Sequence, residues 1–571
     1  MAAIALSQAA ISQTPPAKPP GAAVKPVVDT YHGVSVADPY RWLERWDDPE
    51  VRAWTDAQNE YTRGYLDALP FMPQVRARVQ ALGADTHPRW FAVQYRRGRL
   101  FVIKHQPPHE QSVLVVLSSA DDAASEKTVV DPIALDPSGK TAIDFYTPSL
   151  DGSRVAVSLS QGGTERGDVH VFDVASGRAL PDVIPRVNGG TAGGSVAWNA
   201  DGSGFYYTRY PRPGERPDAD LDFYQQLYFH KLGAATDTDS YEIGKDSPKI
   251  AETVARSSDD GRFVLVTVNN GDGGERAYFV RPANGSWIRL AGYTDEIDGA
   301  AWGRDNALYL LSRKGAPRGQ VLRIAPSASP SLANARVVVP QGNAAIESIA
   351  VTDTRLYTND VIGGPSQLRS FALDGTRGRT IALEPISAVR DVEALSGDDV
   401  LYLAESYVTP PAYYRVGAGG SPAKTALAMT SPVDFADMEV RRVEATSKDG
   451  THVPLNIVMR RGTALDGRNP TLLEAYGGYG VSLTPFFSPL LRLWLEQGGV
   501  YVVANLRGGG EFGDAWHQAG RLTKKQNVFD DFFAAASYLV EQRYTRPTSL
   551  AIVGGSNGGL LMGAALTQHP E

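Results

Sequence analysis

The sequence predicts a fold in two parts: a β-propeller in the middle of the chain, followed by a mostly parallel sheet covered by helices. Three observations support this prediction. A turn rich in Asp and Gly, followed by a strand of alternating apolar residues, recurs seven times between residues 87 and 432. Beyond residue 432, near-continuous apolar strands alternate with helical stretches. The last strand ends at a serine between glycines and leads into an apolar, alanine-rich helix.

The composition excludes several classes of protein. A chain of 571 residues is longer than one domain usually is, so we expect at least two domains. A net charge of −8, without a run of basic residues, argues against nucleic-acid binding. The absence of cysteine excludes disulfides, thiolate metal sites and a cysteine nucleophile. No apolar run approaches the roughly 18 residues of a membrane span. We expect a soluble monomer of the cytoplasm or periplasm, with no cofactor, no metal and no membrane partner.

The sequence of the first part of the chain predicts a tail followed by a helical stretch. Residues 1–28 join a short apolar start to a Pro- and Ala-rich stretch, and they lack the basic region and longer apolar core of a signal peptide. We expect a tail or the remnant of a trimmed signal. Asp48-Pro49-Glu50 then marks a helix start, and apolar residues at helical spacing follow as far as Leu82. This helical stretch is expected to pack its apolar face on another domain.

The middle of the chain is built from repeats. Copies of the turn-and-strand unit, about 45 to 60 residues apart, begin at Arg97, Asp151, Asp201, Asp260, Asp305, Asp353 and Asp398. A period of this length with several strands per repeat is typical of a β-propeller, so the count predicts seven blades. The alternative is a β-sandwich with chance turn similarity. We find no metal-ligand spacing here, and we interpret the histidines as structural or solvent-facing, for example His105, His109, His170 and His230.

The last part of the chain predicts the α/β sheet. A hairpin is expected at residues 439–459, and two apolar strands, 471–476 and 500–505, each end in a glycine-rich turn. The remaining expected elements are helices at 490–497 and 529–542 and a strand from Leu550. Strands and helices in alternation indicate a sheet that is mostly parallel and covered on both sides.

The strand from Leu550 runs into Gly554-Gly555-Ser556-Asn557-Gly558, which is the pattern of a nucleophile elbow in α/β-hydrolases. The elbow holds its serine in a strained backbone conformation, and the glycines avoid collisions with the neighbouring strand and helix. The free N–H groups of the helix N-terminus favour negative charge at the serine. Glycine-rich turns of this kind also bind phosphates, but the strand–turn–helix context favours a nucleophile.

Four stretches resemble the prolyl oligopeptidase family of serine peptidases: residues 38–44 (DPYRWLE), 476–480 (YGGYG), 505–513 (NLRGGGEFG) and 554–559 (GGSNGG). The resemblance implies an α/β-hydrolase domain formed from both chain ends and capped by a seven-bladed propeller. The expected boundaries are 29–86 for the N-terminal part of the peptidase domain, 87–432 for the propeller, and 433–571 for the catalytic domain, after the tail of residues 1–28.

The same resemblance implies an activity and a set of site residues. Ser556 would be the nucleophile, and the backbone N–H of Asn557 and the hydroxyl of Tyr476 would form the oxyanion hole. Tyr479 would form the aromatic wall of a proline pocket. The implied activity is that of a serine endopeptidase that cuts short proline-containing peptides after proline through an acyl-enzyme, with the propeller restricting access. Asn557 favours the prolyl branch, and the chain lacks the Glu-Glu pair of dipeptide-removing relatives.

The sequence does not supply the other catalytic groups. A serine nucleophile needs a base and an orienting carboxylate, which follow the serine in α/β-hydrolases. After Ser556 there is no aspartate, and the one histidine, His569, stands thirteen residues further on. In a helix that separation is about 20 Å, so His569 is not the base. Upstream His517, Asp530 and Asp531 fit the expected order poorly.

We therefore expect an α/β-hydrolase domain that is C-terminally incomplete, either as a truncated copy or because the sequence omits its last part. Such a chain alone is expected to be inactive and poorly stable. Two alternatives stay open. One is a sibling oligopeptidase or esterase with the same elbow. The other is an inactive fragment or a propeller-based binding protein with a dead hydrolase domain.

Overall fold

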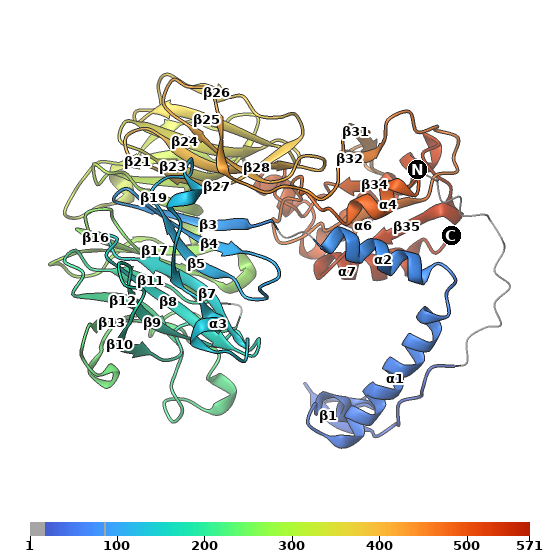
Figure 1. Cartoon of the computed structure of the whole chain (residues 1–571), viewed down its shortest axis with the longest axis horizontal. Helices are drawn as coiled ribbons and strands as arrows, with labels where there is room; N and C mark the ends of the chain where they lie inside the picture. The colour runs from blue at the N-terminus through green and yellow to red at the C-terminus, as the bar shows by residue number, and fades with distance from the viewer. Residues whose placement is uncertain (1–17, 85–86, 191) are drawn as a thin grey trace. The chain divides into compact units, whose positions relative to one another are not determined.

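The structure of the chain is a computed structural model, and it describes residues 18–84, 87–190 and 192–571. The chain divides into two compact units, Met1–Ala84 with Pro489–Leu493, and Asp85–Ser488 with Trp494–Glu571 (Figure 1). Most of the predicted tail, residues 1–17, lies outside the described residues. The domain boundaries expected from the sequence stay predictions.

The first unit holds a hairpin and two helices: β1 (Val27–Tyr31), β2 (Val34–Asp38), α1 (Pro49–Asp67) and α2 (Met72–Gly83). The predicted helix start is confirmed, because Pro49 is the first helical residue and the Asp48 side chain accepts a hydrogen bond of 2.9 Å from the Glu50 N–H. The hairpin was not predicted. Its tight turn is formed by His32 and Gly33, whose φ angles of 50° and 82° are both positive.

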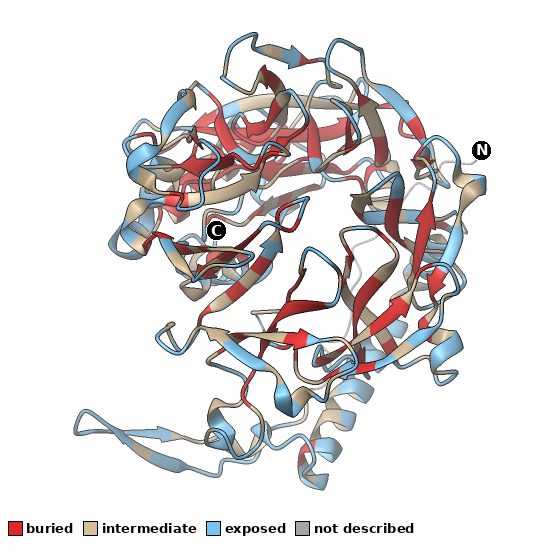
Figure 2. Cartoon of the chain, turned by 90° about the vertical axis from the view of Figure 1, so that its left-hand side faces the viewer, coloured by how far each residue is buried: buried red, intermediate tan, exposed pale blue. Residues whose placement is uncertain are grey.

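The second unit contains seven sheets of four antiparallel strands each, so the prediction of a seven-bladed propeller is confirmed. Each blade uses four consecutive strands. Figure 2 shows buried residues in many of these strands. The strands of blades 1 to 4 are β3 (Arg89–Arg96), β4 (Arg99–His105), β5 (Val113–Leu117), β6 (Lys127–Val130), β7 (Thr141–Pro148), β8 (Arg154–Gln161), β9 (Gly167–Asp173), β10 (Ala179–Ile184), β11 (Val196–Trp198), β12 (Gly204–Arg209), β13 (Gln226–Lys231), β14 (Ser240–Ile243), β15 (Glu252–Ser257), β16 (Phe263–Asn269), β17 (Arg276–Pro282) and β18 (Ile288–Ala291).

The strands of blades 5 to 7 are β19 (Ile297–Trp302), β20 (Leu308–Ser312), β21 (Gln320–Ile324), β22 (Arg336–Val339), β23 (Ala345–Val351), β24 (Arg355–Val361), β25 (Ser366–Ala372), β26 (Arg379–Ile381), β27 (Ser387–Ala394), β28 (Val400–Ser406), β29 (Ala412–Val416) and β30 (Ala423–Ala428). A short helix, α3 (Pro132–Leu135), precedes blade 2. The strands predicted from the repeat are β4, β8, β12, β16, β20, β24 and β28. They are the second strands of the seven blades, which explains the regular spacing of the repeat.

The blades are held together by apolar clusters between neighbours. In the described residues each of the seven neighbouring pairs, including the first and last blade, shares its own buried cluster. Blades 1 and 7 meet through Val93 and Leu100 on one side and Leu401 and Tyr413 on the other. No described strand pairs with a strand of another blade, so side-chain packing closes the ring.

His230 has a structural role, which is one of the two roles expected from the sequence. The ring is fully buried, with Nδ1 2.8 Å from Asp239 and Nε2 3.1 Å from Asp182. Burial alone would lower the pKa of His230, but the hydrogen bonds to Asp239 and Asp182 outweigh this effect and raise it. Because Asp182 belongs to β10 and His230 to β13, the buried ion pair links blades 2 and 3.

The α/β part of the second unit is one five-stranded sheet with the order β31-β32-β34-β33-β35. β31 and β32 form the predicted antiparallel hairpin, and β33, β34 and β35 run parallel. Its elements are β31 (Met438–Thr446), β32 (His452–Arg460), β33 (Thr471–Ala475), β34 (Val500–Ala504), α5 (Asp514–Gln518), α6 (Gln526–Glu541), β35 (Leu550–Val553) and α7 (Asn557–Gln568). The predicted short helix before β34 is α4 (Leu491–Glu496), and its first three residues are assigned to the first unit.

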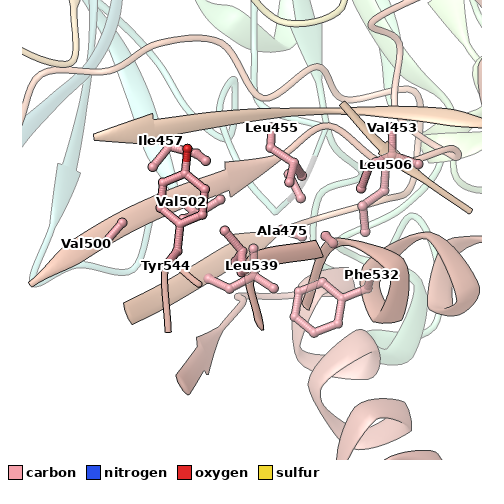
Figure 3. Packing of buried hydrophobic residues seen from close by; sticks show 14 of the residues in the cluster. Val453, Leu455, Ile457, Ala475, Val500, Val502, Leu506, Phe532, Leu539 and Tyr544 are labelled. Carbon is pink, nitrogen blue, oxygen red and sulfur yellow. The ribbon is translucent and has the colours of Figure 1, made fainter. Parts of the chain in front are cut away.

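The core of this sheet lies between its strands and α6. Leu455 and Ile457 of β32, Val502 of β34, and Phe532 and Leu539 of α6 are almost completely buried in one cluster (Figure 3). These residues recur at every second position on the strands and at helical spacing on α6, as the sequence predicts. In the described residues no helix is both long and apolar enough to cross a membrane.

Within the second unit, backbone hydrogen bonds connect the propeller to the loops after β34. The Asp514 N–H donates to the Pro317 carbonyl at 2.7 Å, and the Gly363 N–H donates to the Glu511 carbonyl at 2.9 Å. The Glu511 side chain is 1% exposed and accepts from the Leu483 N–H at 3.0 Å. Burial raises the pKa of Glu511 to about 7.

This buried carboxyl predicts a pH dependence of stability. The pKa of Glu511 is raised in the folded state, so its contribution is complete below the ordinary value near 4.5 and is lost as the pH rises through about 7. From pH 4.5 to pH 8 the wild type should therefore lose about 3 kcal/mol that Glu511→Gln does not lose. Urea unfolding at both pH values measures this difference. Glu541→Gln, on an exposed position of α6, is the matched control. Equal pH dependence in wild type and Glu511→Gln would contradict the prediction.

Candidate active site

Three glycine-rich turns meet at one edge of the α/β sheet. β33 lies between β34 and β35, with Ala475 opposite Ala504 and Glu474 opposite Val553. All three strands are parallel, so their carboxyl ends reach the same edge. The turns at residues 476–480 and 505–510 and the serine turn at 554–558 therefore lie side by side, where α/β sheets commonly bind ligands.

Ser556 stands where β35 turns into α7, in a strained backbone conformation. Its φ of 52° and ψ of −119° lie outside the regions that L-residues normally occupy. A Cβ on Gly554 would lie 2.6 Å from the Gly558 carbonyl oxygen, and a Cβ on Gly558 would lie 2.7 Å from the Ala475 carbonyl oxygen. Both positions therefore require glycine. Ser556 is exposed, and in the described chain its hydroxyl has no hydrogen-bond partner.

Asn557 follows as the first residue of α7. Its backbone N–H has no acceptor within the described residues, as is usual in the first turn of a helix. Its side-chain Nδ2 donates to the Tyr476 carbonyl at 2.6 Å. A Cβ on Gly478 would lie 2.5 Å from the Asn557 amide, so this glycine makes room for the contact. The structure thus brings Tyr476, Ser556 and Asn557 together.

The two tyrosines of the 476–480 turn are placed differently. Tyr476 is half-buried directly after β33, and its hydroxyl has no hydrogen-bond partner in the described residues. Tyr479 is 61% exposed at a φ of 54°, and no described contact joins it to Tyr476, Ser556 or Asn557. Its assignment to a proline pocket stays a prediction.

One residue of the site was missed by the sequence analysis. Lys525, immediately before α6, donates from Nζ to the Gly477 carbonyl and to Asn557 Oδ1, both at 2.8 Å. No motif marks this lysine, because its contacts lie 48 and 32 residues away along the chain. From the sequence alone, a lysine at the start of a helix cannot be distinguished from an ordinary surface residue.

Behind the three turns lies a buried ion pair. Arg507 donates from Nε to Asp531 Oδ2 at 2.9 Å and from Nη2 to Asp531 Oδ1 at 2.6 Å, and it also contacts Asp449. Burial opposes the charge of Arg507, but the hydrogen bonds to Asp531 and Asp449 raise its pKa overall. Arg507 and Glu511 thus have structural roles. They hold the 505–510 turn in place.

No histidine of the described chain reaches the serine hydroxyl. His517 Nδ1 lies 2.8 Å from the Gly508 carbonyl. His569 follows the last residue of α7, a helix of twelve residues that begins next to Ser556. The helix separates His569 from Ser556 by about 20 Å at its usual rise per residue. The His569 ring instead packs on Phe533, with centroids 4.2 Å apart.

A strained serine between a parallel strand and a helix, with an open backbone N–H beside it, defines the class of α/β-hydrolases. Comparison with known proteins gives the family. The family model described as the N-terminal β-propeller domain of prolyl oligopeptidase matches residues 19–420, and the model of the prolyl oligopeptidase family matches residues 485–571. The chain therefore belongs to the prolyl oligopeptidase family of serine peptidases.

Individual relatives agree with this assignment. The chain is 30% identical over 554 residues to a prolyl endopeptidase of Elizabethkingia meningoseptica, a match that covers 95% of this chain and 76% of the relative. It is 28% identical to prolyl oligopeptidase A of Galerina marginata, over 94% of this chain and 77% of the relative. A solved structure from a structural and mechanistic analysis of two prolyl endopeptidases has a TM-score of 0.86 at 34% identity, covering 96% of this chain and 80% of that one.

Proposed function

We propose that the protein is a serine endopeptidase that hydrolyses short peptides on the carboxyl side of proline, through an acyl-enzyme on Ser556. The observation that carries the proposal is the backbone of Ser556, with φ at 52° and ψ at −119°. Strain of this kind persists only where the surrounding structure imposes it, and it exposes the hydroxyl above the sheet. The names of the relatives, prolyl endopeptidase and prolyl oligopeptidase, support the choice of substrate.

In the proposed reaction, Ser556 Oγ attacks the carbonyl carbon after proline and its proton passes to a general base. The carbonyl oxygen becomes negatively charged in the tetrahedral intermediate. The Asn557 N–H and the Tyr476 hydroxyl, both without partners in the described chain, donate to this oxygen. Collapse of the intermediate releases the amine with the proton from the base, and water then hydrolyses the acyl-enzyme. Tyr479 contacts the proline ring, and the propeller restricts entry to short peptides.

We assign no residue of this sequence as the general base or as the carboxylate that orients it. His569 is held at the far end of α7, and Asp531 is fully buried against Arg507. A test of the proposal therefore has to report on Ser556 directly. Serine activation is measured by covalent labelling, independently of which group acts as base.

The test is intact-mass analysis of the protein isolated from its natural source, before and after exposure to a serine-directed fluorophosphonate. We expect one adduct, which peptide mapping places on Ser556. Chromogenic peptides that differ only in the residue before the cut, proline against alanine or lysine, then measure specificity. No adduct on folded protein would overturn the enzyme proposal in favour of a propeller-based binding protein. An adduct without preference for proline would indicate a sibling peptidase or an esterase.

A further inference from the structure

Lys525 is a cation near the candidate site without an acidic partner. In the described residues its Nζ has no carboxylate within 4.0 Å and contacts only two neutral oxygens, those of Gly477 and the Asn557 side chain. Lys525 is half-buried, and this burial lowers the pKa of its ammonium group. Partly burying a charge without a counter-ion is unfavourable. A function at this position would explain a half-buried lysine without an acidic partner.

The contacts of Lys525 form a closed ring with the backbone of the 476–480 turn. Lys525 Nζ donates to the Gly477 carbonyl and to Asn557 Oδ1. Asn557 Nδ2 in turn donates to the Tyr476 carbonyl, which is adjacent to that of Gly477. The Asn557 amide therefore binds the first of two consecutive carbonyls, and the Lys525 ammonium binds the second. The ammonium and the amide are also hydrogen-bonded to each other. Each of the three hydrogen bonds limits the movement of the other two.

The ring joins the two chain segments that supply the proposed oxyanion donors. One donor is the Tyr476 hydroxyl, after β33, and the other is the Asn557 N–H, at the start of α7. These residues are 81 positions apart in the sequence. An oxyanion hole stabilises the transition state only if its donors are already in place when charge develops. The relative position of the two donors therefore depends on the ring that Lys525 closes.

We propose that Lys525 is a positioning residue that fixes the two oxyanion donors relative to each other, acting through the Asn557 side chain and the Gly477 carbonyl. The proposal rests on the proposed function above. It also gives Asn557 a second role, because the side chain positions Tyr476 while the backbone N–H binds the oxyanion.

The test compares Lys525→Met with the wild type on a chromogenic proline peptide. Methionine keeps most of the apolar stem and removes all three N–H donors. We expect kcat to fall about 10- to 100-fold with KM changed less than about twofold, because the lost interaction acts in the transition state. The rate of phosphonylation of Ser556 should fall by a similar factor. Lys524→Met is the matched control, since Lys524 is exposed and its side chain has no described contact.

A double-mutant cycle separates positioning from a general loss of stability. Asn557→Ala removes the other side of the ring and keeps the backbone N–H. If Lys525 acts through Asn557, the double variant should be about as slow as Asn557→Ala alone, whereas independent effects would multiply. The Asn557→Ala arm also tests the ring if Lys525→Met does not fold. A kcat of Lys525→Met within twofold of wild type, or effects that multiply, would overturn the inference. A wild type that is neither labelled nor active would overturn the proposed function instead.

Discussion

Replacing Ser556 with alanine is expected to abolish peptidase activity and fluorophosphonate labelling. Loss of the nucleophile removes the acyl-enzyme route, and kcat should fall about 10⁴- to 10⁶-fold, to the level that substrate binding and the oxyanion donors sustain. Steady-state kinetics and intact mass measure this result. Ser549→Ala, a few residues upstream, is the control and should remain active. Residual labelling of Ser556→Ala would place the reactive serine elsewhere.

The backbone strain at Ser556 can be tested by measuring stability, independently of catalysis. Glycine adopts positive φ freely, whereas serine and alanine do not. Ser556→Gly should therefore raise the free energy of unfolding by about 1 to 2 kcal/mol, while Ser556→Ala should leave it nearly unchanged. Urea unfolding of the three proteins tests this. A serine at a position where glycine would be more stable fits a functional role for its hydroxyl. Equal stability of the wild type and the two variants would argue against backbone strain at residue 556.

The parts of the fold that the sequence predicts well are those with a local, repeated signal. β4, β8 and the other second strands of the blades follow the same turn, so spacing alone reveals seven blades. α6 and the elbow are likewise marked by residues close together in the chain. The hairpin of β1 and β2 was not predicted. His32-Gly33 between two short strands is a weak form of the two-residue turn that is typical of hairpins.

The ring around the oxyanion donors shows why part of the site escapes such reasoning. Asn557 and Tyr476 are recognisable because each lies in a glycine-rich turn with a characteristic spacing. Lys525 reaches the same place only through the folded sheet, and its partners are a backbone carbonyl and a side-chain amide. Every residue has a backbone carbonyl, so the residue type that supplies the carbonyl does not indicate that a lysine binds it. Only the three-dimensional structure reveals such a residue.

Replacing Tyr476 with phenylalanine is expected to give the second-largest loss. The change removes one oxyanion donor, and kcat should fall about 100- to 1000-fold with KM nearly unchanged. Because the Tyr476 hydroxyl has no hydrogen-bond partner in the described chain, stability should not fall with it. Kinetics on a proline peptide and thermal unfolding of the same samples measure both effects.

Tyr479→Phe is the matched control for this prediction. Both tyrosines lie in the 476–480 turn, but Tyr479 is proposed to act through its ring, so loss of its hydroxyl should change kcat less than about twofold. Tyr479→Ala should instead raise KM, because it removes the proposed contact with the proline ring. Equal losses in Tyr476→Phe and Tyr479→Phe would mean that the hydroxyl of Tyr476 has no special role. The Asn557 N–H would then be the single proposed oxyanion donor, and Lys525 would have one donor to position instead of two.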